Sequence, residues 1–184
     1  MPSSALPYSL VSADSTTVNV VSTAAQTTVF SKQFSGGFFT PNSGIRIKVA
    51  VSAAATTTTA TGSTLNVNYN GVSVAALGLT SVTALQSNGA DNISGMSSLS
   101  EIVILNQNSL SSQKYFILNN MVVTAYILHA STAGSTVIPG ASGFSGGTST
   151  VDFSQPGLLE ITLTNSNAQA NTFTYQSSII EKIG

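Results

Sequence analysis

The segment "GFSGG", Gly143–Gly147, has the G-x-S-x-G spacing of a serine-hydrolase nucleophile. That chemistry needs Ser145 on a sharp turn between a strand and a helix, followed along the chain by an acid and then a histidine. The only histidine of this chain, His129, comes before the serine, and glycine-rich sequence surrounds the motif. We therefore expect a loop here and no catalytic serine.

The other ionisable residues do not form a catalytic or metal-binding pattern either. A zinc site needs several nitrogen or sulfur ligands, whereas the chain has one histidine and no cysteine. A glycosidase needs two carboxylates that flank one cleft. Asp152 and Glu160 could be neighbours across the turn at 154–157, but alternation with Leu159 and Ile161 turns Glu160 toward solvent. The sequence predicts no enzyme, no cofactor and no metal site.

The composition favours self-association. Only 6% of the 184 residues are charged and the net charge is −1, while 30 serines and 23 threonines supply the polar surface. A surface with so little charge has little electrostatic repulsion to keep copies apart. We expect a homo-oligomer; a neutral monomer that is kept soluble by its hydroxyl groups is the alternative.

Several classes of partner and location are disfavoured. The five basic residues form no cluster of the kind that binds phosphates, so we expect no nucleic acid. No run of 18 apolar residues is long enough to span a membrane. The opening "MPSSALPYSL" lacks the basic residues and the long apolar core of a secretory signal. We expect a protein made in the cytoplasm without an export signal.

The hydrophobic pattern predicts β-strands throughout. In "GIRIKVAVSAAA", Gly44–Ala55, apolar residues alternate with polar or small ones, as in a strand with one buried face. Asn70-Gly71 between two such strands is a strong signal for a two-residue hairpin turn. "SEIVILNQ", Ser100–Gln107, is apolar on both faces, which predicts a well-covered central strand. The long apolar stretch Gln113–Ala130 is either one strand with a bulge or two strands.

These elements predict an all-β fold. About eight strands, with glycine, asparagine and serine turns and no helical period, indicate an antiparallel β-sandwich of the jelly-roll type over residues 14–184. We expect loops at 53–63 and 131–147. Residues 1–13 show no periodicity and predict an extended N-terminal arm that docks on another subunit through Pro2, Pro7, Tyr8 and Leu10.

Two aromatic residues next to a glycine pair are candidates for contact with a partner. Phe38 and Phe39 follow Gly36-Gly37 and lie outside the clear strands. Exposed rings stack on the apolar faces of sugars, and they also fill protein interfaces. The sequence leaves both uses open.

Three segments carry a resemblance to a known group of proteins. They are "SGGFFTPNSGIRIKVAVSA", the pair "SEIVILNQ" and "YFILNNMVVTAYILHAS", and the closing "TVDFSQPGLLEITLTNSNAQANTFTYQSSIIEKI". With these segments the chain resembles, over roughly residues 27–183, the small jelly-roll virion proteins of tailed phages. That group includes capsid decoration (cement) proteins and related fibre or tip modules. The Thr56–Thr59 run and the N-terminal arm have no counterpart in the resemblance.

The resemblance implies a bacteriophage structural protein located in the virion. Its leading form is a homotrimer that docks on the major capsid protein and stabilises the shell. The alternative is a tail fibre, tip or adhesin module that binds a host glycan or receptor through loops rich in serine, threonine and glycine.

Overall fold

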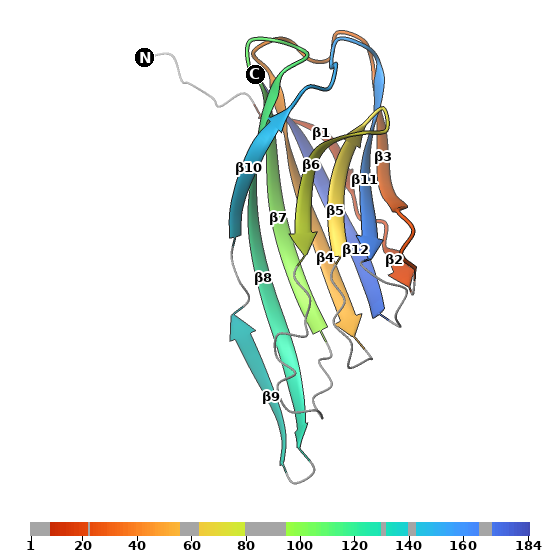
Figure 1. Cartoon of the computed structure of the whole chain (residues 1–184), viewed down its shortest axis with the longest axis vertical. Helices are drawn as coiled ribbons and strands as arrows, with labels where there is room; N and C mark the ends of the chain where they lie inside the picture. The colour runs from red at the N-terminus through yellow and green to blue at the C-terminus, as the bar shows by residue number, and fades with distance from the viewer. Residues whose placement is uncertain are drawn as a thin grey trace.

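The computed structural model describes residues 8–21, 23–55, 63–79, 95–129, 132–139, 143–165 and 171–184. The described residues form twelve strands in two antiparallel sheets, which pack face to face as a sandwich (Figure 1).

The larger sheet has eight strands in the order β1-β12-β4-β7-β8-β10, with β2 also paired to β12 and β9 also paired to β8. Its strands are β1 (Tyr8–Asp14), β2 (Val18–Val21), β4 (Gly44–Ala55), β7 (Gly95–Asn106), β8 (Gln113–His129), β9 (Thr132–Pro139), β10 (Gly143–Ser149) and β12 (Asn171–Ile183). The smaller sheet has the order β3-β11-β5-β6. Its strands are β3 (Thr27–Phe34), β5 (Ser63–Tyr69), β6 (Val72–Leu79) and β11 (Gly157–Asn165).

The strand order is that of a jelly roll. β1 and β2 pair with the two ends of β12, so together they act as one interrupted strand. Without β2 and the β8–β10 segment, the sheets read β1-β12-β4-β7 and β3-β11-β5-β6. In chain order this is strands 1-8-3-6 against 2-7-4-5, which is the arrangement of an eight-stranded jelly roll. The predicted antiparallel jelly-roll sandwich is confirmed.

Strands β8, β9 and β10 are an addition to the jelly roll, inserted between β7 and β11. They extend the larger sheet beyond β7 (Figure 1). β8 is one continuous strand, as in the first of the two alternatives for that stretch, but its pairing with β7 has no register shift and so lacks the expected bulge. Its second half pairs with β9 and continues beyond Gly95, the first residue of β7.

The prediction of a loop over 131–147 is wrong, because β9 and β10 occupy most of it. Two of the three glycines of β10, Gly146 and Gly147, are packed closely against β8, and they do not mark a loop. A side chain at Gly146 would meet the Tyr115 carbonyl oxygen at 2.8 Å, and one at Gly147 would meet the Tyr115 hydroxyl oxygen at 2.6 Å.

The core lies between the sheets and follows the predicted alternation. Ile45, Ile47 and Val49 of β4 are fully buried, as are Leu159 and Ile161 of β11 on the opposing sheet. Asn119 of β8 brings a polar group into this core, where its Oδ1 accepts hydrogen bonds from Ser98 Oγ at 2.6 Å and Ser100 Oγ at 3.0 Å. The pairing satisfies these polar groups inside the core.

The predicted hairpin at Asn70-Gly71 is confirmed. Asn70 has φ 50° and Gly71 has φ 78°, and they join β5 to β6. Both values lie in the left-handed region that a type I′ turn requires.

All five basic residues of the chain lie inside strands. Lys32 is in β3, Arg46 and Lys48 are in β4, Lys114 is in β8 and Lys182 is in β12.

Candidate functional site

The side of the larger sheet that faces away from the smaller sheet, called the outer face below, carries the exposed apolar side chains. In the part of the chain that the structure describes, the large apolar residues that are exposed lie on this face, with Val72 of β6 as the exception. They are Tyr8, Leu10, Val21, Leu99, Leu118, Val122, Phe144 and Ile179. Exposed apolar side chains gathered on one face mark an interaction surface.

The strands of the larger sheet place these residues in rows. One row crosses six strands in register and consists of Ala13, Ile179, Lys48, Glu101, Leu118 and Phe144. The neighbouring row lies nearer to Gly95, the first residue of β7. It consists of Ser177, Ala50, Leu99 and Asn120. Apolar residues therefore flank a central pair of opposite charges.

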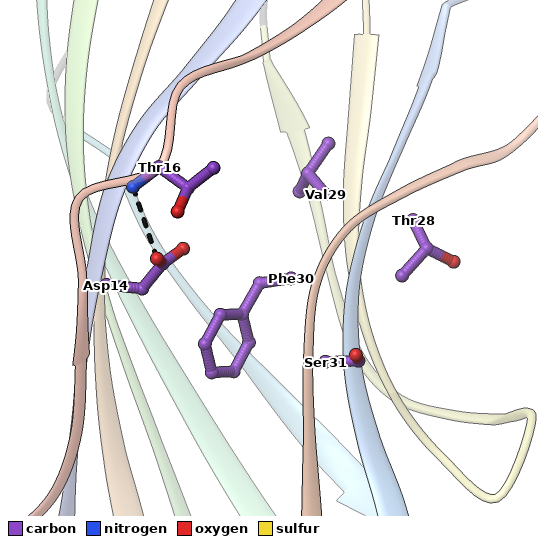
Figure 2. Close-up of a pocket in the computed structure, with 6 residues that line it drawn as sticks. All are labelled: Asp14, Thr16, Thr28, Val29, Phe30 and Ser31. Carbon is purple, nitrogen blue, oxygen red and sulfur yellow. Dashed lines mark hydrogen bonds between the residues drawn. The ribbon is translucent and has the colours of Figure 1, made fainter.

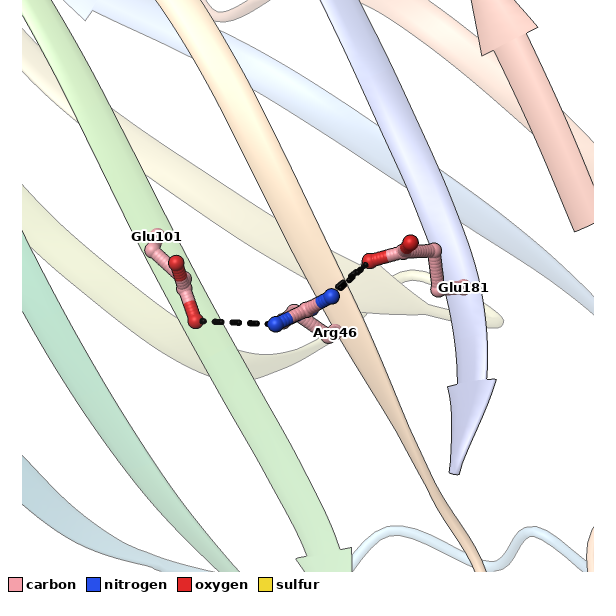
Figure 3. Close-up of polar contacts among 3 residues, drawn as sticks. All are labelled: Arg46, Glu101 and Glu181. Carbon is pink, nitrogen blue, oxygen red and sulfur yellow. Dashed lines mark hydrogen bonds and ion pairs between the residues drawn. The ribbon is translucent and has the colours of Figure 1, made fainter. Parts of the chain in front are cut away.

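Arg46 anchors a charged network on the outer face. Figure 3 shows its guanidinium between Glu181 on β12 and Glu101 on β7. Arg46 Nε donates to Glu181 Oε2 at 2.6 Å, and Nη1 lies 3.8 Å from Glu101 Oε1. The Tyr8 ring lies 4.2 Å from the guanidinium carbon, a cation–π contact.

The surroundings of Arg46 hold it in the charged form. The hydrogen bond to Glu181 is the largest influence and raises the pKa of Arg46, while partial burial opposes it and the charges of Glu181 and Glu101 add to the rise. The Arg46 and Glu181 side chains are only 21% and 20% exposed, although they lie on the outer side of the sheet. This pair is therefore neutralised within one copy of the chain.

A shallow hollow of about 220 Å³ lies beside the central pair. It is lined by Lys48, Leu99, Glu101, Leu118 and Asn120. Next to it, the rings of Phe116 and Phe144 stack with their centroids 6.1 Å apart. The hollow lies between charged groups on one side and apolar groups on the other, which is suited to a protein side chain.

A second hollow, of about 310 Å³, lies between the end of β1 and the edge strand β3. Figure 2 shows the Phe30 ring extending from β3 toward Asp14, whereas the side chains of Thr28 and Ser31 point away from it. Asp14 Oδ1 accepts a hydrogen bond from the Thr16 amide at 3.1 Å, and Oδ2 accepts one from the Tyr175 hydroxyl at 2.9 Å.

These contacts set the ionisation of Asp14 and Tyr175. Burial alone would raise the pKa of Asp14, but hydrogen bonds from Thr16, Tyr175 and Ser15 outweigh it and lower the pKa below 3.8. Burial raises the pKa of Tyr175 strongly; its bond to Ser178 lowers that pKa, and the Asp14 carboxylate raises it further. Asp14 thus stays a carboxylate and Tyr175 a neutral phenol across the ordinary pH range.

The residues predicted for a docking arm are partly described. Pro2 and Pro7 lie outside the described residues. Tyr8 and Leu10 lie on β1, the edge strand paired with β12, and Leu10 is 67% exposed. The boundary expected between residues 13 and 14 falls inside β1, so this part of the arm is a strand of the chain's own sheet.

Phe38 and Phe39 are held by the chain's own core. Phe39 is 3% exposed and stacks on Phe153 with the ring centroids 4.4 Å apart. Phe38 is half-buried, and Lys182 Nζ lies 4.8 Å from the centre of its ring. These rings, with Phe34, close one end of the sandwich.

The motif residues considered for catalysis are far apart. Ser145 lies within β10 opposite Ile117, and His129 follows Ile117 by twelve positions on β8. At roughly 3.3 Å per residue this separation is about 40 Å. Asp152 accepts a hydrogen bond from the Ser154 amide at 2.8 Å, whereas Glu160 accepts one from Thr28 Oγ1 at 3.3 Å.

Two features are absent from the described ranges. Within them, no three or more histidine, aspartate or glutamate side chains gather closely enough to hold a metal ion. No helix that could cross a membrane occurs in the same residues.

Sequence reasoning missed the outer face. "SEIVILNQ" is apolar on both sides, as noted, but only one side is fully covered: Ile102 and Ile104 are buried, whereas Val103 and Leu105 on the other side are only partly buried. Leu99, on that same outer side of β7 just before the segment, is 55% exposed. The usable signal was the combination of an apolar second face with the chain's few charged residues on the same strands, Arg46, Lys48 and Glu101.

Comparisons with known proteins give a structural likeness but no match of sequence. No protein-family model matches the chain, and no curated protein matches it. Among solved structures, it is similar to the CBM2 module of the evolved Dit of Lactobacillus casei BL23 phage J-1. The TM-score is 0.33 and the identity 13%, over 82% of this chain and 67% of that one. The jelly-roll assignment rests on the strand pairing and not on this likeness.

Proposed function

We propose that this protein is a virion structural protein, a capsid decoration subunit that assembles with copies of itself and docks on a viral shell. The observation that carries the proposal is the outer face, where eight large apolar side chains are exposed in a chain with only 6% charged residues. Burial of such side chains between subunits releases roughly 25 cal/mol per Å² of apolar surface. The proposal gives the chain no catalytic role.

The resemblance to small jelly-roll virion proteins supplies the virion part of the proposal. The edge of β1 is the surface we assign to the shell, because this strand ends the larger sheet and pairs only with β12 among the described strands. An edge strand can pair with an extended segment of another protein. The major capsid protein is the partner this docking would use.

Quantitative mass spectrometry of purified particles tests the proposal. Particles are isolated from the cells that produce the protein, and the ratio of this chain to the major shell subunit is measured across preparations. We expect a fixed ratio, together with rebinding of the purified protein to stripped shells that saturates at that ratio. A chain that stays in the soluble fraction, or that binds without saturation, would overturn the proposal.

The second candidate is a tail fibre or tip module that binds a host glycan, and the hollow at Asp14 is the observation that favours it. A carboxylate that stays ionised beside an aromatic ring can accept hydrogen bonds from sugar hydroxyls while the ring stacks on the sugar. A glycan array separates the two candidates. Binding that is lost in the Phe30→Ala variant would support the second candidate, and no binding to any glycan would reject it.

A further inference from the structure

The rows of the outer face are self-complementary about a line that runs along the strands between β4 and β7. In the central row, Lys48 and Glu101 lie on either side of this line. Ile179 and Leu118 lie one strand further out, and Ala13 and Phe144 lie beyond them. A half-turn about the line exchanges the members of each pair.

We propose that two copies of this chain stack their outer faces about a two-fold axis along that line. The inference rests on the proposed function, since it names the partner of the surface through which the subunit assembles. In this contact Lys48 of one copy lies over Glu101 of the second copy, and the reverse. Ile179 lies over Leu118, so opposite charges meet and apolar side chains meet.

The neighbouring row has the same property. It pairs Ala50 with Leu99 and Ser177 with Asn120 about the same line. Apolar again meets apolar and polar meets polar, so two rows agree on one axis. A contact in which the same patch serves both partners is what a two-fold dimer requires.

The row through Arg46 imposes no repulsion on this contact. It consists of Leu10, Glu181, Arg46, Val103, Phe116 and Gly146. The half-turn places Arg46 over Val103 and Glu181 over Phe116. Because the Arg46–Glu181 ion pair is closed at 2.6 Å within each copy, neither charge is left alone against an apolar neighbour.

The sheet geometry permits the stacking. A half-turn about an axis along the strands relates one twisted sheet to a second sheet with the same twist. The two facing surfaces are then parallel, so the distance between them stays nearly constant. Stacked sheets lie about 10 Å apart with aligned strands. The hollow beside Leu99 and Asn120 then faces Ile179 of the second copy, which is 40% exposed and can enter it.

The inserted strands make the face symmetric. Without β8 and β10 the outer face would end at β7, and the axis would lie at one edge of it. Leu118 and Phe144 come from the insertion and are the counterparts of Ile179 and Ala13. The addition to the jelly roll thus supplies the half of the surface that a second copy needs.

A mixing experiment with two charge variants tests the contact. In a dimer of the Lys48→Glu variant, positions 48 and 101 are both acidic, so acidic side chains of the two copies face each other. In a dimer of the Glu101→Lys variant, both positions are basic, so basic side chains face each other. Each should raise the dimer dissociation constant by about tenfold or more. An equimolar mixture should form heterodimers with the unmodified affinity, because the acidic face of one variant then meets the basic face of the other. Sedimentation velocity over a concentration series measures all three constants.

A substitution that acts only within its own copy would weaken association in the mixture as it does alone. A mixture that does not regain the unmodified affinity would therefore overturn the inference. Leu118→Asp is the apolar counterpart and should abolish the dimer, whereas Val72→Asp, at an exposed site on the other sheet, should not. Thermal unfolding of each variant at low concentration identifies a variant that has failed to fold.

The outcomes also separate this inference from the proposed function. A trimer with no further association would overturn the two-fold contact, because a two-fold contact joins copies in pairs, yet it would leave shell binding intact. A dimer that shows complementation but does not saturate stripped shells would keep the contact and overturn the decoration role. A monomer at high micromolar concentration overturns the contact.

Discussion

At the scale of single residues, the chain concentrates its few charges where they have partners. Arg46 reaches Glu181 and Glu101 and stacks on Tyr8, while Asp14 accepts bonds from Thr16 and Tyr175. With only 11 charged residues against 53 serines and threonines, each paired charge is a local anchor. Substitution of an anchor should therefore have an effect that substitution of an unpaired charge does not.

Arg46→Ala tests the first anchor. It leaves Glu181 and Glu101 without their shared cation, and hydrogen bonds to charged groups contribute about 1.5–3 kcal/mol. We expect the free energy of unfolding to fall by about 1–2 kcal/mol, as measured by urea denaturation at low protein concentration. Lys48→Ala, on the same strand and face, is the matched control and should change stability by less than about 0.5 kcal/mol. Equal losses in both variants would contradict the assignment.

Asp14 predicts a dependence of stability on pH. Because its pKa is lower in the folded chain than the ordinary 3.8, the unfolded chain takes up a proton first as the pH falls. The stabilisation by Asp14 is fully present above the ordinary pKa and is lost as the pH falls through the folded value. Urea denaturation in a pH series should show this loss, and Asp14→Asn should remove it. An unchanged slope in the variant would show that another group is responsible.

At the scale of elements, the strands are set by alternation in some places and by close packing in others. Alternation in β4 and β11 and the Asn70-Gly71 turn could be predicted from the sequence, because they depend on nearby residues. β10 could not, since its Gly146 and Gly147 are dictated by Tyr115 on β8. The outer face was missed for a related reason: an apolar pattern taken alone does not tell whether a second layer covers it.

Gly157, the first residue of β11, is a further position dictated by packing. A side chain there would run into the ring of Tyr69, which is fully buried and donates a hydrogen bond to the Gln155 carbonyl oxygen at 2.9 Å. We expect Gly157→Ala to destabilise the protein by about 1–3 kcal/mol in thermal or urea unfolding. Gly78→Ala, in β6 with open space around it, is the control and should change stability by less than about 0.5 kcal/mol.

At the scale of the whole molecule, the sandwich has two different surfaces. The smaller sheet carries Val72 as its exposed large apolar residue in the described part, whereas the larger sheet carries the others. The insertion of β8–β10 widens only the larger sheet. This asymmetry is what the proposed contact between two outer faces requires, because only the larger sheet offers a wide apolar surface.

The position of every basic residue inside a strand has a consequence for proteolysis. Trypsin cleaves after lysine and arginine, and a bond held in a sheet must first open before it can be cut. Under native conditions we expect the chain to resist trypsin for hours, with the first cut at Lys32, because β3 is an edge strand paired only with β11. Gel electrophoresis of a digestion time course checks this, and rapid cleavage at Lys48 or Lys114 would contradict it. In urea, the appearance of fragments then reports the opening of the sheets themselves.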